Sequence, residues 1–166
     1  VVGGHTHVRH GTLPRGGMTD LMVEYTQTDG RNLYVANHGS ANGQGSGVYV
    51  LHDVLTGPAR KKNKQWQRLF APRFQAGAVR SLAARDGFTT IFVGVDHEGL
   101  YKLQRERRGT WRVVTGPLSV GESRTFYDLD TAPRSQTIYA ATDDGLFTID
   151  REDRVRRVAI PAFAGL

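Results

Sequence analysis

The chain has 166 residues, 39% hydrophobic and 23% charged, which is enough apolar content to bury a core and argues against wholesale disorder. No stretch approaches the roughly 18 consecutive apolar residues of a membrane-spanning helix. The absence of cysteine excludes disulfides, thiolate metal sites and cysteine nucleophiles.

The formal net charge of +6 would suit an acidic partner, but the excess is partly local, with three short basic clusters at 60–64, 105–108 and 151–157. We interpret these clusters as solvated hairpin loops and edge strands, where lysine and arginine discourage strand-to-strand aggregation. No nucleic-acid-binding motif accompanies them and no aromatic residues alternate with them, so a nucleic-acid partner is not expected.

Read in chain order, the sequence predicts twelve short strands, each an apolar, β-branched or aromatic run bounded by turn residues. The first four are expected at 18–26, 32–37, 47–52 and 66–70. The next four are expected at 79–84, 90–95, 99–104 and 111–114. The last four are expected at 125–130, 137–142, 145–150 and 155–160.

These strands form a threefold repeat of roughly 45 to 55 residues, a period typical of four-stranded propeller blades. Turns such as Asp86-Gly87 favour tight hairpins, because glycine accepts a positive φ. We therefore predict one all-β domain over 1–166, with three four-stranded antiparallel blades and an interblade or N-terminal segment at 1–17. The blades are placed at approximately 18–70, 79–114 and 125–160.

The blade pattern of apolar run, polar turn, Gly-Leu-Tyr/Phe and a loop ending in tryptophan resembles the repeats of sialidase-like and sortilin-like β-propellers. Such families often carry an Asp-box hairpin, and segment 104–111 keeps its Thr110-Trp111 ending, with the glycine displaced and the Ser and Asp absent. The resemblance implies a β-propeller that binds a glycan or protein, and it favours an extracytoplasmic or secreted location. It also implies an alternative function, sialidase-type glycoside hydrolysis.

Three blades do not close a propeller ring, because known rings have about four to eight blades. The unpaired faces would expose more apolar surface than a soluble monomer tolerates. We expect either covalent continuation into further blades or self-association of two chains into six blades. Neither arrangement calls for a membrane.

The loops between the second and third strand of each blade would meet at one mouth of the channel, the usual place for a propeller ligand. They hold the predicted ligand-binding residues His38, Asp96, His97, Asp143 and Asp144. The aspartates have a second interpretation as ordinary turn formers. The two histidines are less needed for turns.

An N-terminal histidine cluster, His5, His7 and His10, has spacing that could hold zinc if a carboxylate joined it. A lone His-x-His is more often a surface cluster in a mobile terminus. No metal site and no cofactor is predicted.

The enzyme alternative would need a carboxylate pair or an arginine that holds a substrate carboxylate. Asp20, Asp128 and Asp130 lie on or beside the innermost strands, and Arg80 and Arg124 lie at the starts of such strands. No set matches a complete catalytic motif. A binding module is therefore preferred, and catalytic residues are left unassigned.

Aromatic residues at matching positions predict the packing between blades. Tyr34, Phe92 and Tyr139 occupy equivalent strand positions and are expected to be interblade core. Trp66 and Trp111, at the start of the outermost strands, are expected to pack between blades rather than to stack on a sugar.

Overall fold

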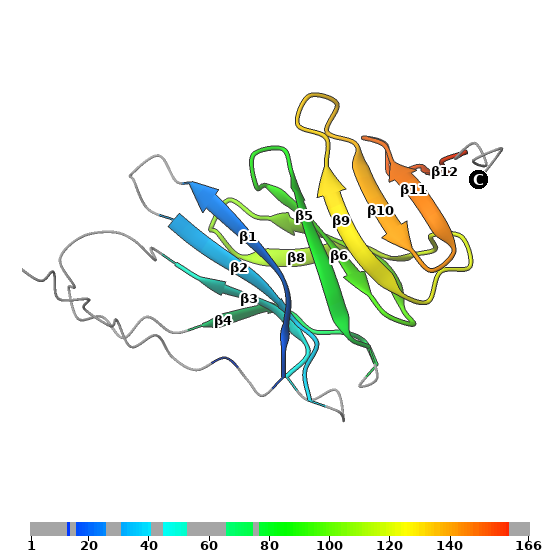
Figure 1. Ribbon diagram of the computed structural model, residues 1–166. Coiled ribbons are helices and arrows are strands. Elements are labelled where there is room, and N and C mark those ends of the chain that lie inside the picture. The colour runs from blue at the N-terminus through cyan, green and yellow to red at the C-terminus, as the bar shows by residue number, and fades with distance from the viewer. Residues whose placement is uncertain are drawn as a thin grey trace, which may run out of the picture.

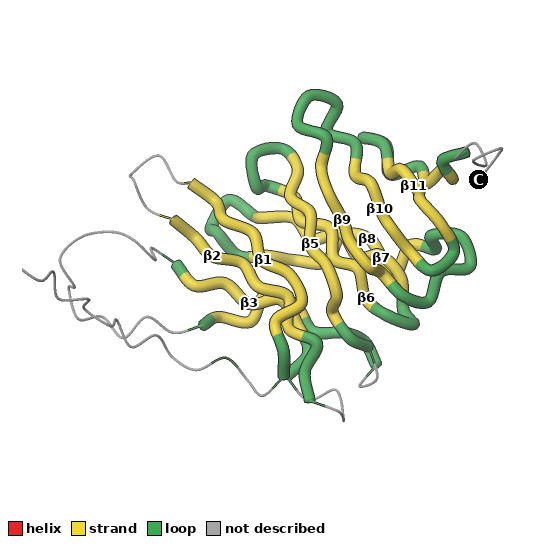
Figure 2. The backbone as a smooth tube through the Cα atoms, in the orientation of Figure 1, coloured by secondary structure: helices red, strands yellow, loops and turns green. Residues whose placement is uncertain are grey.

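The computed structural model describes residues 13, 16–25, 31–40, 45–52, 66–74 and 77–159. The described residues form twelve strands joined by turns and loops and contain no helix (Figure 2). The search for an apolar helix long enough to cross a membrane, made over the same residues, therefore found none.

The strands form three separate antiparallel sheets of four, each built from strands consecutive in the chain. Sheet 1 contains β1 (Met18–Tyr25), β2 (Arg31–Asn37), β3 (Gly47–Leu51) and β4 (Gln67–Phe70). Sheet 2 contains β5 (Val79–Arg85), β6 (Thr90–Val95), β7 (Gly99–Arg105) and β8 (Trp111–Leu118). Sheet 3 contains β9 (Phe126–Thr131), β10 (Ile138–Thr142), β11 (Gly145–Ile149) and β12 (Val155–Arg157).

The prediction of an all-β chain with three four-stranded antiparallel sheets is therefore confirmed, while the sheets do not close on themselves. The clearest differences in strand length are in the outermost strands. β8 runs on to Leu118, whereas β12 ends at Arg157.

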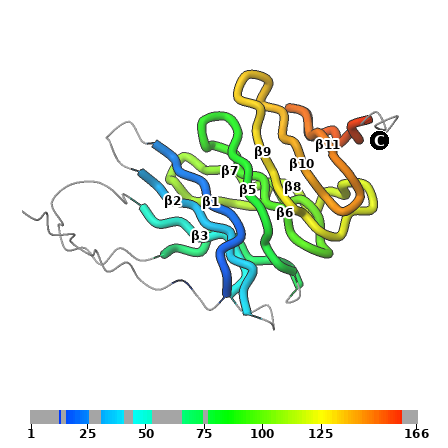
Figure 3. The backbone as a smooth tube through the Cα atoms, in the orientation of Figure 1, coloured from blue at the N-terminus to red at the C-terminus, as the bar shows by residue number. Residues whose placement is uncertain are grey.

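The first strand of each sheet lies beside the first strand of the next, so β1, β5 and β9 run side by side through the molecule (Figures 1 and 3). Side chains bond to the main chain across these contacts. The hydroxyl of Thr19 in β1 donates to the carbonyl of Val79 at 2.8 Å, and that of Thr131 in β9 donates to the carbonyl of Ala84 at 2.7 Å. We call β1, β5 and β9 the inner strands.

Sheet 2 is covered on both faces, and this explains its unbroken apolar run at 90–95. In β6, Ile91, Val93 and Val95 pack in the core shared with sheet 1, whereas Phe92 packs in the core shared with sheet 3. Because successive side chains of a strand point to opposite faces, a strand buried on both sides has no need of alternating polarity.

The interblade prediction for the three equivalent aromatic residues is confirmed for two, whereas the third is not buried in the single chain. Tyr34 and Phe92 are fully buried, the first against sheet 2 and the second against sheet 3. Tyr139 is 41% exposed, because no described strand covers the face of sheet 3 on which it lies. Trp111 packs edge-on against Tyr34, as expected.

At the far ends of the inner strands, ion pairs join neighbouring sheets. Glu24 of β1 accepts two hydrogen bonds from Arg105 of β7, at 2.7 and 2.6 Å. Arg85 of β5 donates to the carboxylate of Asp153, in the turn between β11 and β12, at 3.0 Å, and to the carbonyl of Asp150. The two ion pairs lie at the same end of the inner strands. The inner strand supplies the carboxylate in the first pair and the guanidinium in the second.

Candidate functional site

The turns that follow the second strands lie against the starts of the inner strands. The amides of His38, Asp96 and Asp143 donate to main-chain carbonyls just before β1, β5 and β9. These carbonyls belong to Gly17, Ala78 and Thr125. The three turns thus occupy equivalent places at the starts of the inner strands. We call the surface that β1, β5 and β9 form the inner-strand surface, and its edge at these starts the rim.

The side chains of two of these residues also accept main-chain amides at the starts of the inner strands. Nε2 of His38 accepts a hydrogen bond from the amide of Gly17 at 3.0 Å. One carboxylate oxygen of Asp143 accepts the amides of Arg124 at 2.9 Å and Thr125 at 3.0 Å. The bonds from Thr125 and Arg124 lower the pKa of Asp143, because they favour the charged form.

Asp96 joins two sheets and is only 4% exposed. Its Oδ1 accepts the amide of Phe126, the first residue of β9, at 3.2 Å. Its Oδ2 accepts the Nε–H of Arg80, on β5, at 2.5 Å. Asp96 therefore links sheet 2 to sheet 3 and also orients an arginine on the inner-strand surface.

Asp144 and the repeat-equivalent Glu98 hold the loops that lead into the inner strands. Asp144 accepts the amide of Glu122 at 2.9 Å and a hydrogen bond from Arg157 at 2.5 Å, and the guanidinium of Arg157 is the main cause of its lowered pKa. Glu98 accepts the amides of Arg73 and Phe74.

His97 differs from the other four predicted residues, because its side chain is exposed and forms no hydrogen bond with a described residue. Its main chain has a positive φ of 62° and its amide donates to the carbonyl of Arg124. Direct ligand contact by these five residues stays a prediction.

The N-terminal histidines His5, His7 and His10 lie outside the described residues, as does 41–44 of the first long loop. Over the part of the chain that the structure describes, no group of three histidine, aspartate or glutamate side chains could hold a metal ion.

A β-bulge recurs at the same place in all three inner strands. The register against the second strand slips between Met18 and Asp20, between Val79 and Ser81, and between Phe126 and Asp128. The extra residues are Thr19, Arg80 and Tyr127. Bulges re-aim side chains and are common beside functional sites, so three equivalent bulges on adjacent strands mark this rim as a candidate site.

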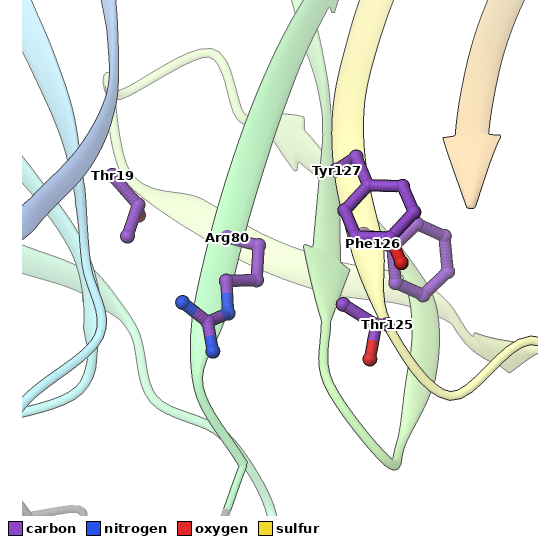
Figure 4. Close-up of a pocket in the computed structure, with 5 residues that line it drawn as sticks. All are labelled: Thr19, Arg80, Thr125, Phe126 and Tyr127. Atoms are coloured by element: carbon purple, nitrogen blue, oxygen red, sulfur yellow. The ribbon is translucent and has the colours of Figure 1, made fainter. Parts of the chain in front are cut away.

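The three bulge residues line one shallow pocket of about 350 Å³, together with Thr125 and Phe126. Figure 4 shows the guanidinium of Arg80 between Thr19 of β1 and the residues of β9. We call this hollow the bulge pocket.

The donors of the bulge pocket suit an anion. Arg80 is 41% exposed at its side chain, lines the pocket and binds Asp96 through Nε, and its guanidinium lies between Thr19 and β9 (Figure 4). A guanidinium fixed at one edge still offers donors that match a carboxylate. Tyr127 is 66% exposed and adds an aromatic ring beside them.

A second pocket, of about 390 Å³, lies further along the inner strands and is acidic. Asp20, Asp128 and Asp130 line it with the apolar side chains of Met22 and Leu82. Burial raises the pKa of Asp20, and the nearby charge of Asp128 adds to the shift, although the amides of Leu82 and Leu21 bond to the carboxylate and oppose it.

Replacing Asp20 by asparagine is expected to raise the free energy of unfolding at pH 7. A pKa raised in the folded state means that the contribution of Asp20 to stability is greatest below its unfolded pKa and falls as the pH rises through the folded value. Asparagine keeps an oxygen that can accept the amide of Leu82 and removes the buried charge. Urea unfolding at pH 7 and pH 3 measures the effect, and a gain of equal size at both values would contradict it.

The inner-strand bulges are the feature that sequence reasoning missed. Arg80 was singled out as an arginine at the start of an inner strand, but Thr19 and Tyr127 were not placed beside it. Their common position, directly before Asp20, Ser81 and Asp128 in the three repeats, is the signal that an alignment of the inner strands could have provided.

A search of protein-family models found no match, and a search of curated proteins found no relative. Any function for the candidate site must therefore be argued from its geometry.

Proposed function

We propose that the protein is a ligand-binding module built as an arc of β-propeller blades, and that the bulge pocket binds a carboxylate-bearing glycan. The observation that supports this most directly is the meeting of three repeat-equivalent bulge residues, Thr19, Arg80 and Tyr127, in one pocket. A propeller arc is supported by three consecutive antiparallel sheets whose first strands lie side by side.

An acidic sugar fits the chemistry of the pocket better than a neutral one. Arg80 supplies charged donors for a carboxylate, and a sugar ring can stack on the exposed face of an aromatic side chain such as Tyr127. Thr19 already donates its hydroxyl proton to Val79, so its oxygen is left to accept a sugar hydroxyl. An acidic protein segment is the alternative ligand.

Arg80→Gln is expected to weaken binding of a uronic- or sialic-acid-containing oligosaccharide at least tenfold, because it removes the charge that pairs with the carboxylate. Isothermal titration calorimetry against acidic oligosaccharides and their neutral, reduced counterparts measures the effect. Arg134→Gln, in an exposed loop, is the matched control and should bind as the unmodified protein does. Equal affinity for acidic and neutral sugars, or no binding of either, would contradict the proposal.

Glycoside hydrolysis is a second candidate function because the acidic pocket holds two carboxyl groups with different surroundings. Asp20 has a raised pKa, as a general acid requires, and Asp128 shares the same pocket. Both oxygens of Asp20 already accept main-chain amides, and this favours a structural role. Release of the chromophore from aryl glycosides, lost in Asp128→Asn, would support the enzyme instead of the binding module.

A further inference from the structure

The two outer sheets of the three-sheet array each expose part of a surface that is buried where neighbouring sheets meet. Equivalent positions in the three sheets can be matched by strand register. Tyr34, Phe92 and Tyr139 each pair with the inner strand on one side and with the third strand on the other. We call the face that bears these aromatic residues the leading face of each sheet.

The leading face is covered in sheets 1 and 2 and exposed in sheet 3. Tyr34 in sheet 1 and Phe92 in sheet 2 are fully buried under the following sheet, whereas Tyr139 in sheet 3 is 41% exposed. Leu100 of β7 is also fully buried, and its equivalent Leu146 in β11 is only partly so. The leading face of sheet 3 thus lacks the sheet that covers its two equivalents.

Small residues on the leading face allow the inner strand of the next sheet to approach closely. A methyl group added to Gly94 of sheet 2 would lie 2.8 Å from the ring of Phe126, so glycine lets the next inner strand approach. Ala141 is the register equivalent of Gly94 in sheet 3. It is half-buried, and no described sheet follows sheet 3 to cover it.

The opposite face, which we call the trailing face, shows the reverse pattern along the inner strands. Leu82 in β5 and Leu129 in β9 are 2% and 4% exposed, because each packs against the preceding sheet. The register equivalent in β1, Leu21, is 52% exposed. On the same face of sheet 1, Val35 and Leu51 are buried, so the open part is the inner strand.

We propose that sheet 3 of one copy packs on the inner strand of sheet 1 of a second copy, with Tyr139 and Leu21 at the contact. The contact would repeat, at the inner strand of sheet 1, the packing that joins sheets 1 and 2 and sheets 2 and 3, since Tyr139 and Leu21 are both exposed where their equivalents are buried. Two copies supply six sheets, within the range of about four to eight blades in closed propellers, so a twofold pair can close without growing into a filament.

Light scattering of the purified protein over a range of concentrations is expected to give a mass of twice 18.3 kDa. Leu21→Glu and Tyr139→Arg place a charge at the contact, and each alone should give a monomer at concentrations where the unmodified protein is a dimer. Both positions are exposed in the single chain, so circular dichroism and the unfolding midpoint should show that each variant still folds. Val113→Glu, at a 47% exposed position on the outermost strand of sheet 2, is the control and should remain dimeric.

Mixing the two charged variants separates this contact from other modes of association. A mixed pair has one unmodified contact and one in which the introduced glutamate faces the introduced arginine, so the mixture should recover the dimer mass. A protein that is monomeric at every concentration would overturn the proposal and assign the open faces to another polypeptide segment. A dimer insensitive to Leu21→Glu would overturn it in favour of a contact elsewhere. All of these measurements are made without ligand, so their result is independent of the proposed glycan binding.

Discussion

Replacing Glu24 by alanine is expected to lower the free energy of unfolding by about 3 kcal/mol, because it breaks a buried ion pair that joins sheets 1 and 2. Glu24 is 7% exposed and accepts hydrogen bonds from Arg105, Asn32 and Tyr34. The alanine variant leaves the guanidinium of Arg105 in a largely buried place without its carboxylate. Urea unfolding at pH 7 measures the loss as a lower midpoint.

The pH dependence gives this prediction a second readout. Burial alone would raise the pKa of Glu24, but the hydrogen bonds from Arg105, Asn32 and Tyr34 outweigh burial and lower it below its ordinary value. A lowered folded pKa means that the stabilisation is present above the unfolded pKa of about 4.3 and is lost as the pH falls through the folded value. The difference between Glu24→Ala and the unmodified protein should therefore shrink below about pH 4.

Glu106→Ala is the matched control for a charge removed from an exposed pair. Glu106 is 49% exposed at its side chain and lies 3.3 Å from Arg112, whose side chain is 63% exposed. Surface pairs of this kind contribute about 1 kcal/mol or less. Equal losses in the two variants would show that the Glu24 pair contributes no more than a solvated one.

The twelve strands could be predicted because their signals are local. Apolar and β-branched runs bounded by turns such as Asp86-Gly87 specify short strands, and short turns make consecutive strands antiparallel neighbours. The threefold repeat then gave three sheets of four. Equivalent residues in a repeat share a face, and this is why Tyr34 and Phe92 were correctly placed in the core.

Repeat equivalence could not reveal where the stack of sheets ends. Tyr139 has the same sequence context as Phe92, but burial depends on the neighbouring sheet and not on the strand that carries the residue. The inner-strand bulges were missed for a related reason. The one-residue slip at Arg80 shows directly in the pairing of β5 with β6, whereas in the sequence it appears only when the three inner strands are aligned with one another.

The predicted loop residues raise a different difficulty, because turn formation and ligand binding use the same residue types. Asp96 and Asp143 are both turn residues whose carboxylates accept main-chain amides at the inner-strand starts. Asp96 also holds Arg80, so its effect on the bulge pocket is indirect. Sequence spacing brought these residues to the correct rim but could not distinguish a residue that positions a donor from one that touches the ligand.

Phe92→Ala is expected to lower the free energy of unfolding by about 4 kcal/mol, the range for removing a large aromatic side chain from a core. Phe92 is fully buried between sheets 2 and 3, and Arg85 lies over its ring at 4.8 Å. The alanine variant leaves a cavity at this contact. Urea unfolding measures the loss, and Tyr139→Ala at the equivalent position of sheet 3 is the matched comparison.

In a single chain Tyr139→Ala should change the free energy of unfolding by about 1 kcal/mol or less, because the side chain is already 41% exposed. Measured at low protein concentration, the two variants should therefore differ by several kilocalories per mole. At concentrations where two copies associate, the loss for Tyr139→Ala should grow, since unfolding then also separates the pair. Losses of similar size at every concentration would mean that the leading face of sheet 3 is as well covered as that of sheet 2, and the assignment of an open face would be wrong.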